Sequence, residues 1–168
     1  MKNLTKCLAL LMIGFSTNMF AQAGAIASAA VNIVAPISIT KSVDMNFGIV
    51  ATGMTEAGTA MLNTDGTRST TGGVTIPPTS GSPTAASFVV TGTGNYTYEI
   101  SLPSAPITLN GATEGVTVGS FVSSPNATGT LNAGTQTVYV GATLNVPEST
   151  VPGSYSNGSG LKVTVNYN

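Results

Sequence analysis

The sequence predicts an all-β fold, and three observations lead to this prediction. After the first 23 residues, apolar side chains recur with a period of two and no stretch has a helical period. Val and Thr, which favour strands, are abundant. Pairs such as Asp65-Gly66 and Asn110-Gly111, which tolerate positive φ, separate the alternating runs. About nine short strands in roughly 145 residues are typical of a single immunoglobulin-like β-sandwich, with a small barrel as the alternative.

The N-terminus is typical of a secretory signal peptide over residues 1–23. Lys2 and Lys6 form a short positive region, an apolar run extends from residue 8 to residue 20, and Ala21-Gln22-Ala23 supplies small residues for cleavage. The apolar run has roughly 13 residues, whereas a membrane-spanning helix needs about 20. Cys7 precedes the run, so it is not placed for lipid attachment. We therefore expect cleavage after Ala23 and an exported protein in the periplasm, at the cell surface or outside the cell.

Residues 24–168 are predicted to be one β-sandwich domain. Three basic and six acidic residues remain after cleavage, which gives a net charge of about −3. This balance offers no basic surface for nucleic acid or anionic lipid. The domain contains no cysteine, so no disulfide can stabilise it. No later stretch is apolar enough to span a membrane.

The predicted strands follow in order along the chain. The first is an alternating run over residues 29–40, interrupted at Pro36, which must lie at an edge or a bulge because proline donates no ladder hydrogen bond. The second has an apolar face formed by Met45, Phe47 and Ile49. The other seven are residues 57–64, 67–76, 86–90, 96–102, 116–122, 137–146 and 161–167. Residues 77–83 are predicted to form a loop.

The residue types present argue against an enzyme. The domain has no His, Cys or Trp, which excludes a Ser–His–Asp triad, a Cys–His pair and a His-based zinc site. A glycosidase would need paired carboxylates, but Glu99 alternates with Tyr98 and is predicted to face solvent. We therefore predict no catalytic residue, no metal ligand and no cofactor.

Two weaker chemical patterns have simpler interpretations. Asn63, Asp65 and Gly66 include calcium-ligand types, but the full loop signature is missing and an Asx-type turn is the preferred interpretation. A Lys–Asn crosslink would join Lys41 to Asn166 and needs a buried acid, for which Asp44 is the nearby candidate. We interpret Lys41 as a surface lysine.

Several motifs resemble a known family. They are Pro36-Ile37-Ser38-Ile39, Met45-Asn46-Phe47-Gly48, residues 86–92 (ASFVVTG), residues 98–103 (YEISLP), residues 140–146 (VGATLNV), Pro152-Gly153-Ser154-Tyr155 and residues 163–168 (VTVNYN). In this order they resemble an exported Gram-negative family catalogued as a domain of unknown function. That family is similar to spore-coat-U-like and chaperone–usher pilin-like sandwiches, and the resemblance covers nearly all of residues 24–168.

The resemblance implies a structural or adhesive role. Leu161, Val163, Val165 and Tyr167 resemble the C-terminal strand of a pilin, which alternates apolar residues and ends with a penultimate Tyr. Residues 25–35, with Val31, Ile33 and Ala35, would form the segment that pilins add as a strand to a neighbouring copy, or that pairs with a periplasmic chaperone. The sequence lacks the paired cysteines of many pilins.

Two alternatives remain open at this point. The end segments can both be ordinary strands of one closed sandwich, and for the N-terminal segment we favour this interpretation. The protein can also be a secreted carbohydrate-binding module in which Tyr96, Tyr139 or Tyr155 forms a stacking platform. The sequence therefore predicts a non-catalytic, secreted structural or adhesive cell-surface protein, with a fimbria-like subunit as its most specific form.

Overall fold

The computed structural model describes residues 22–112, 115–158 and 160–168. The predicted signal peptide up to residue 21 and the acidic residue Glu114 lie outside the described residues. The chain divides into two units, Met1–Ile33 and Val34–Asn168. Residues 22–33, the described part of the first unit, contain neither helix nor strand.

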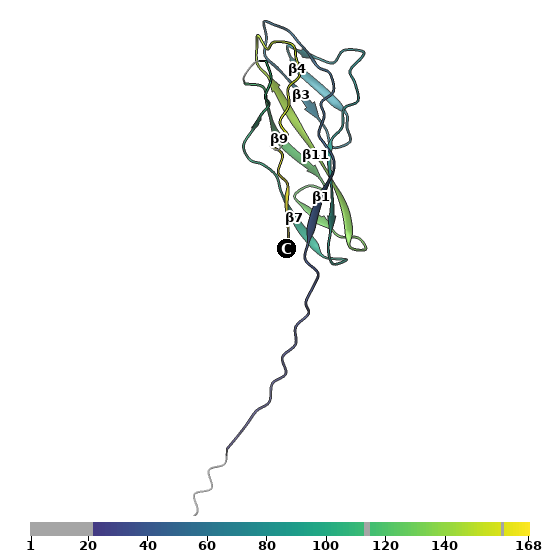
Figure 1. Ribbon diagram of the computed structural model, residues 1–168. Coiled ribbons are helices and arrows are strands. Elements are labelled where there is room, and N and C mark those ends of the chain that lie inside the picture. The colour runs from purple at the N-terminus through teal and green to yellow at the C-terminus, as the bar shows by residue number, and fades with distance from the viewer. Residues whose placement is uncertain (1–21, 113–114, 159) are drawn as a thin grey trace, which may run out of the picture. The chain divides into compact units, whose positions relative to one another are not determined.

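The second unit is all-β, as predicted, with sheets curled into a sandwich-like arrangement (Figure 1). The described residues form twelve strands rather than the nine expected. They are β1 (Ser38–Val43), β2 (Ala51–Thr52), β3 (Gly58–Leu62), β4 (Arg68–Gly72), β5 (Val74–Thr75), β6 (Ala86–Thr91), β7 (Thr97–Ser101), β8 (Ile107–Thr108), β9 (Thr117–Ser124), β10 (Thr128–Thr130), β11 (Thr135–Val146) and β12 (Thr164–Tyr167). No helix that could cross a membrane occurs in these residues.

The larger sheet is organised around β11, its longest strand. Residues Thr135–Val140 of β11 pair with β6, residues Ala142–Val146 pair with β3, and Tyr139–Asn145 pair with β9, all antiparallel. Because Tyr139 pairs with both β6 and β9, these two strands lie on opposite edges of β11. The path β1-β6-β11-β3-β4 ends at β1 and β4, and β8 pairs with β9.

A smaller sheet contains three strands in the order β10-β7-β12, and β2 and β5 form a separate pair. β12 pairs with β7 from Thr164 opposite Ser101 to Tyr167 opposite Tyr98. β12 is thus an end strand of its sheet, as β1 is of the larger one. β1 and β12 contact each other, which brings the two sheet edges together.

The interior consists of two apolar clusters. In the first, the larger sheet packs against the smaller one, with Val90, Tyr98, Leu131 and Val138 fully buried. The second lies over β3, β9 and the later part of β11, and no strand of the three-stranded sheet contributes to its buried residues. Partly buried residues from loop segments cover it, among them Phe47, Leu109 and Tyr155. The first cluster therefore lies between two sheets, whereas loop segments rather than a second sheet cover the second cluster.

Several strand predictions were wrong in detail. Residues 29–37 belong to no strand, and β1 begins only at Ser38. Residues 45–49 form a single β-bridge, between Asn46 and Thr84, rather than a strand. The run predicted over 67–76 is divided at Gly73 into β4 and β5. Three short strands, β2, β8 and β10, were not predicted because two or three residues carry no detectable alternation.

Candidate functional site

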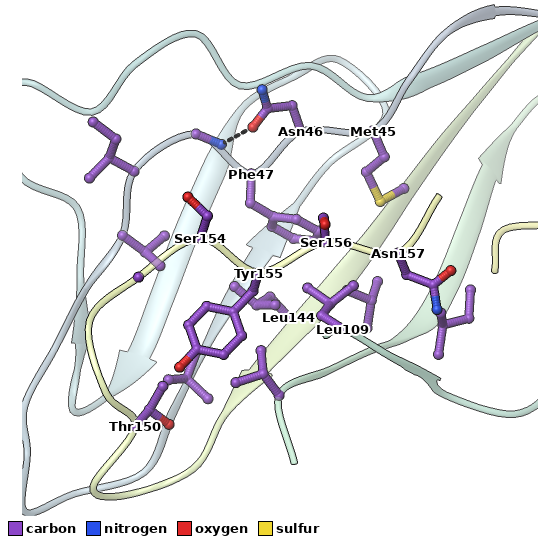
Figure 2. Close-up of a pocket in the computed structure, with 18 of the residues that line it drawn as sticks. Met45, Asn46, Phe47, Leu109, Leu144, Thr150, Ser154, Tyr155, Ser156 and Asn157 are labelled. Atoms are coloured by element: carbon purple, nitrogen blue, oxygen red, sulfur yellow. Dashed lines mark hydrogen bonds between the residues drawn. The ribbon is translucent and has the colours of Figure 1, made fainter. Parts of the chain in front are cut away.

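An apolar groove of about 1120 Å³ lies over the second cluster and is the candidate site (Figure 2). Its floor is formed by Val116, Val118, Leu144 and Val146, which are nearly fully buried. One wall is the segment 43–52, which begins at the last residue of β1 and ends with β2. The other wall is formed by residues 150–157, together with Leu109 from the β8 end and Leu161. Figure 2 labels Phe47 of the first wall and Ser154, Tyr155 and Ser156 of the second among the residues that line the groove.

A β-bulge turns Phe121 into this groove. β9 pairs with β11 through Val118 opposite Leu144 and through Val122 opposite Gly141, so β9 has an extra residue between these pairs. Ser120 takes up the irregularity with φ +49°. The bulge shifts the inward-facing set from even to odd positions, and Phe121 becomes partly buried against both apolar clusters.

Backbone hydrogen bonds hold the first wall against the loop that precedes β6. Asn46 exchanges two bonds of 2.8 Å with Thr84, and the Ile49 N–H donates to the Ser80 carbonyl at 2.7 Å. Within the wall, the Gly48 N–H donates to Asn46 Oδ1 at 2.7 Å, as drawn in Figure 2. Gly48 has φ +67°, a conformation that favours glycine.

Arg68, the first residue of β4, ties this wall down from outside the groove. Its guanidinium donates to the carbonyl oxygens of Phe47 and Ile49, the latter at 3.2 Å, and reaches the Ser80 carbonyl at 3.5 Å. A guanidinium can serve several acceptors because its donors form a planar fork. Arg68 thus fixes the curvature of the wall instead of forming an ion pair.

The second wall is held by polar side chains. Ser156 exchanges backbone bonds of 2.9 and 3.0 Å with Asn110, and Asn157 Nδ2 donates to the Thr108 carbonyl at 2.8 Å. Tyr155 Oη donates to the Val151 carbonyl at 2.6 Å, which leaves its ring, half-buried, as part of the lining. The two walls are therefore each anchored to their own neighbours, with the groove between them.

The groove lining is almost uncharged. Asp44 is the one charged residue among the described residues that line it. Asp44 pairs with Lys41 at 2.6 Å at the surface, with side chains 78% and 57% exposed. Among the described residues, no three His, Cys, Asp or Glu side chains gather as metal ligands. The chemistry of the site is that of apolar contact and backbone hydrogen bonding.

The beginning of the second unit is fastened by Tyr167, the penultimate residue. Tyr167 Oη donates to the Ala35 carbonyl at 3.0 Å and accepts the Thr93 N–H at 2.7 Å. The Ala35 N–H in turn donates to Thr93 Oγ1 at 2.9 Å. The Tyr96 ring packs edge-on against Tyr167, with centroids 5.7 Å apart and planes at 62°. We call these four residues, Ala35, Thr93, Tyr96 and Tyr167, the tyrosine clasp.

The N-terminal site residues predicted from the sequence differ in their hydrogen bonding. Val31 and Ile33 are 84% and 86% exposed, and Ile26 is fully exposed. Ala35 is exposed but is bound through both its backbone groups to the clasp. The closed sandwich that we favoured for this segment is wrong, because residues 22–37 occupy no strand position.

The C-terminal site residues are brought into the core, as the alternation predicts. Val163 and Val165 are buried in the first cluster, and Leu161 and Tyr167 are partly buried against it. Leu161 also lines the groove. The hydrogen bond from Tyr167 to the Ala35 carbonyl therefore joins the predicted C-terminal strand to the predicted N-terminal segment.

The three tyrosines of the carbohydrate-binding alternative lie on different elements. Tyr96 is in the clasp, Tyr139 is 45% exposed on β11, and Tyr155 lines the groove. Among the described residues the one close aromatic pair is Tyr96 with Tyr167. These positions do not form a shared stacking platform.

The remaining chemical patterns have structural explanations. Asp65 Oδ1 accepts the Thr67 N–H at 2.9 Å and the Thr67 hydroxyl at 2.6 Å, which is the predicted Asx-type turn. These bonds, led by the one from the hydroxyl, lower the pKa of Asp65. Glu99 is exposed on β7, as predicted. Asp44 is too exposed to be the buried acid that a Lys41–Asn166 crosslink would need.

The sequence did not reveal the groove residues Phe47, Leu109 and Tyr155 or the role of Arg68. Alternation predicted an apolar face of Met45, Phe47 and Ile49; Met45 and Phe47 pack against the second cluster, whereas Ile49 is 55% exposed. No pattern in the sequence indicates that the opposite sheet lacks a strand over that face. A missing neighbour is a property of the tertiary arrangement and has no local sequence signal.

Comparison with known proteins identifies the family. Residues 37–167 match the family model described as Domain of unknown function (DUF4402), and the chain belongs to this family. The matched region begins two residues after Ala35, so the exposed segment 22–33 lies outside it. No curated protein and no solved structure matches the chain.

Proposed function

We propose that this DUF4402 protein is an exported, non-catalytic structural or adhesive subunit of the cell surface, which assembles with copies of itself in a fimbria-like manner. The observation that carries the proposal is the exposure of an apolar, uncharged segment. Residues 22–36 contain no charged side chain, and Ile26, Val31 and Ile33 are each more than 80% exposed. An apolar segment of this kind is stabilised by contact with a partner surface.

Covering this segment has an apolar gain and an entropic cost. Burying a Val or Ile side chain contributes roughly 1.5–3 kcal/mol. Ordering the backbone costs about 1–2 kcal/mol per residue, so over the whole segment this cost exceeds the gain from the three large apolar side chains alone. Association then needs backbone hydrogen bonds as well as apolar contacts, and strand addition supplies both. Partners on this proposal are copies of the chain, or a periplasmic chaperone before assembly.

The residue composition supports a role without catalysis. The domain contains no His or Cys, and the groove lining is almost uncharged. An export signal over residues 1–23 would deliver the subunit beyond the inner membrane.

Size-exclusion chromatography with light scattering tests the proposal. The exported protein is compared with a variant lacking residues 24–33, which retains Ala35 and therefore the clasp. We expect the complete protein to form a series of oligomers and the deletion variant to be a monomer. A matched variant, Val31→Ser with Ile33→Ser, removes the apolar side chains while it keeps the length. Oligomers that persist in both variants, or a complete protein that is monomeric at all concentrations, would refute assembly through this segment.

A further inference from the structure

We propose that Asn157 is a site of spontaneous deamidation, which changes one wall of the groove after the protein has folded. The chain contains two Asn-Gly pairs, Asn110-Gly111 and Asn157-Gly158. The structure brings them together, because Ser156 exchanges backbone hydrogen bonds with Asn110. Asn157 itself lines the groove at the end of the second wall (Figure 2). The reaction needs only the chain and water, so it is independent of the proposed function.

An Asn-Gly pair converts its own side chain readily because glycine has no Cβ to hinder the backbone nitrogen that follows the asparagine. The Gly158 nitrogen loses its proton and attacks Asn157 Cγ, so a carbon–nitrogen bond forms and the Cγ–Nδ2 bond breaks. Nδ2 takes up a proton from water and leaves as ammonia. Water then opens the resulting succinimide ring at either carbonyl, which gives aspartate or isoaspartate. The net change converts one amide and one water into one carboxylate and one ammonium ion, without any oxidant.

The chain around Gly158 is open. A Cβ added at Gly158 would meet no atom within 4 Å outside its chain neighbours. The Gly158 N–H makes no hydrogen bond to the part of the chain that the structure describes. The Asn157 side chain is bound at the surface, where Nδ2 donates to the Thr108 carbonyl at 2.8 Å, and water can replace this bond while the side chain turns. The Gly158 nitrogen therefore has room to approach Asn157 Cγ.

The Asn110-Gly111 pair is held in place. Asn110 exchanges backbone bonds of 2.9 and 3.0 Å with Ser156, and a Cβ added at Gly111 would overlap the Tyr155 ring. To bring the Asn110 side chain onto the Gly111 nitrogen, the backbone must turn out of this bridge and displace the ring. Each hydrogen bond that must break slows the reaction, and the loss of one net bond corresponds to about tenfold in rate. We therefore expect Asn157 to react about tenfold faster than Asn110.

The product changes the wall and the charge of the groove. The Asn157 amide donates to the Thr108 carbonyl, whereas an ionised carboxylate only accepts hydrogen bonds. Two acceptors then face each other, so this anchor of the second wall is lost. A negative charge also enters a lining in which Asp44 is the one charged residue among those described. The wall is therefore released at its Asn157 end, and the groove becomes more acidic as the protein ages.

Peptide mapping by mass spectrometry tests the site in the exported protein. The folded protein, and the same protein unfolded in guanidinium chloride, are kept in a mildly alkaline buffer while the conversion of amide to acid is followed at Asn110 and Asn157. In the unfolded chain neither pair has tertiary protection, so the two should react at comparable rates. In the folded protein Asn157 should react about tenfold faster than Asn110. Equal rates in the folded protein, or no reaction at Asn157 while the unfolded chain is converted, overturn the proposal.

Gly158→Ala is the matched variant for the attacking nitrogen. Its Cβ meets open space, so the fold is kept, but the added methyl group hinders the nitrogen and should slow conversion at Asn157 several-fold. An unchanged rate in this variant overturns attack by the Gly158 nitrogen.

Asn157→Asp carries the product from the start and tests its effect on the wall. Amide hydrogen exchange at Asn110 and Ser156 should accelerate several-fold in this variant, because their shared bridge lies beside the lost anchor. Asn32→Asp makes the same change of charge in the exposed N-terminal segment and should leave that exchange unchanged. The same exchange at Asn110 and Ser156 in both variants overturns the release of the wall.

Discussion

Replacement of Tyr167 by Phe tests the clasp that fastens the start of the domain. The change removes one hydroxyl, which donates to the Ala35 carbonyl at 3.0 Å and accepts the Thr93 N–H at 2.7 Å. Each such bond contributes about 0.5–1.5 kcal/mol net. Because Tyr167 is only partly buried, water can replace part of this contribution. We expect the free energy of unfolding to fall by about 1–2 kcal/mol.

Tyr96→Phe is the matched control. Both variants keep the two rings, whose centroids are 5.7 Å apart, so the aromatic contact is the same in each. The Tyr96 hydroxyl makes no hydrogen bond to the part of the chain that the structure describes. The control should change the free energy of unfolding by less than about 0.5 kcal/mol, as expected for a substitution away from special features.

Urea unfolding measures the difference, in a background without residues 24–33 so that self-association does not contribute. A shift of the midpoint at constant slope reports a change in stability alone. If Tyr167→Phe and Tyr96→Phe unfold at the same urea concentration, the hydroxyl does not hold the start of the domain and the reasoning is wrong.

Three other predictions follow from single contacts. Gly92→Ala places a Cβ against Tyr167 Oη and Leu131, so it should lower the free energy of unfolding by about 1–3 kcal/mol. Gly158→Ala is the control, because its Cβ meets open space, and equal thermal midpoints for the two variants would contradict this prediction. In Arg68→Lys, the lysine ammonium cannot reach all three carbonyl oxygens that the guanidinium contacts. Amide hydrogen exchange at residues 46–50 should therefore accelerate, while exchange in β7 does not change. Unchanged exchange at residues 46–50 would show that Arg68 does not hold the wall. The folded-state pKa of Asp65 is lowered by its bonds from Thr67, so its stabilising effect is present above the usual carboxyl pKa and is lost as pH falls through the lowered pKa. An NMR titration that places the Asp65 midpoint at or above the ordinary value, in the protein with Thr67 intact, would contradict the turn geometry.

Local features of the fold were predictable from the sequence because each depends on neighbouring residues. Alternation over residues 96–102 and 137–146 predicted strands that the structure contains as β7 and β11. Within β7, Tyr98 and Ile100 are buried and Glu99 is exposed, as a period of two requires. The Asp65-Gly66 pair predicted the hairpin between β3 and β4, in which Gly66 has φ +83°.

The sequence alone determined the class of the fold, the strand-rich order of its elements and the residue types from which any site must be built. The tertiary structure decided the features that depend on distant partners. Alternation over residues 29–35 is the same whether a neighbouring strand is present or absent, and the structure gives these residues no strand partner. The bulge at Ser120 reverses which side of β9 is buried, and it arises from pairing with β11. The groove lies where loop segments, and no strand of the smaller sheet, cover the second cluster, and the absence of a strand from a facing sheet has no counterpart in the local sequence.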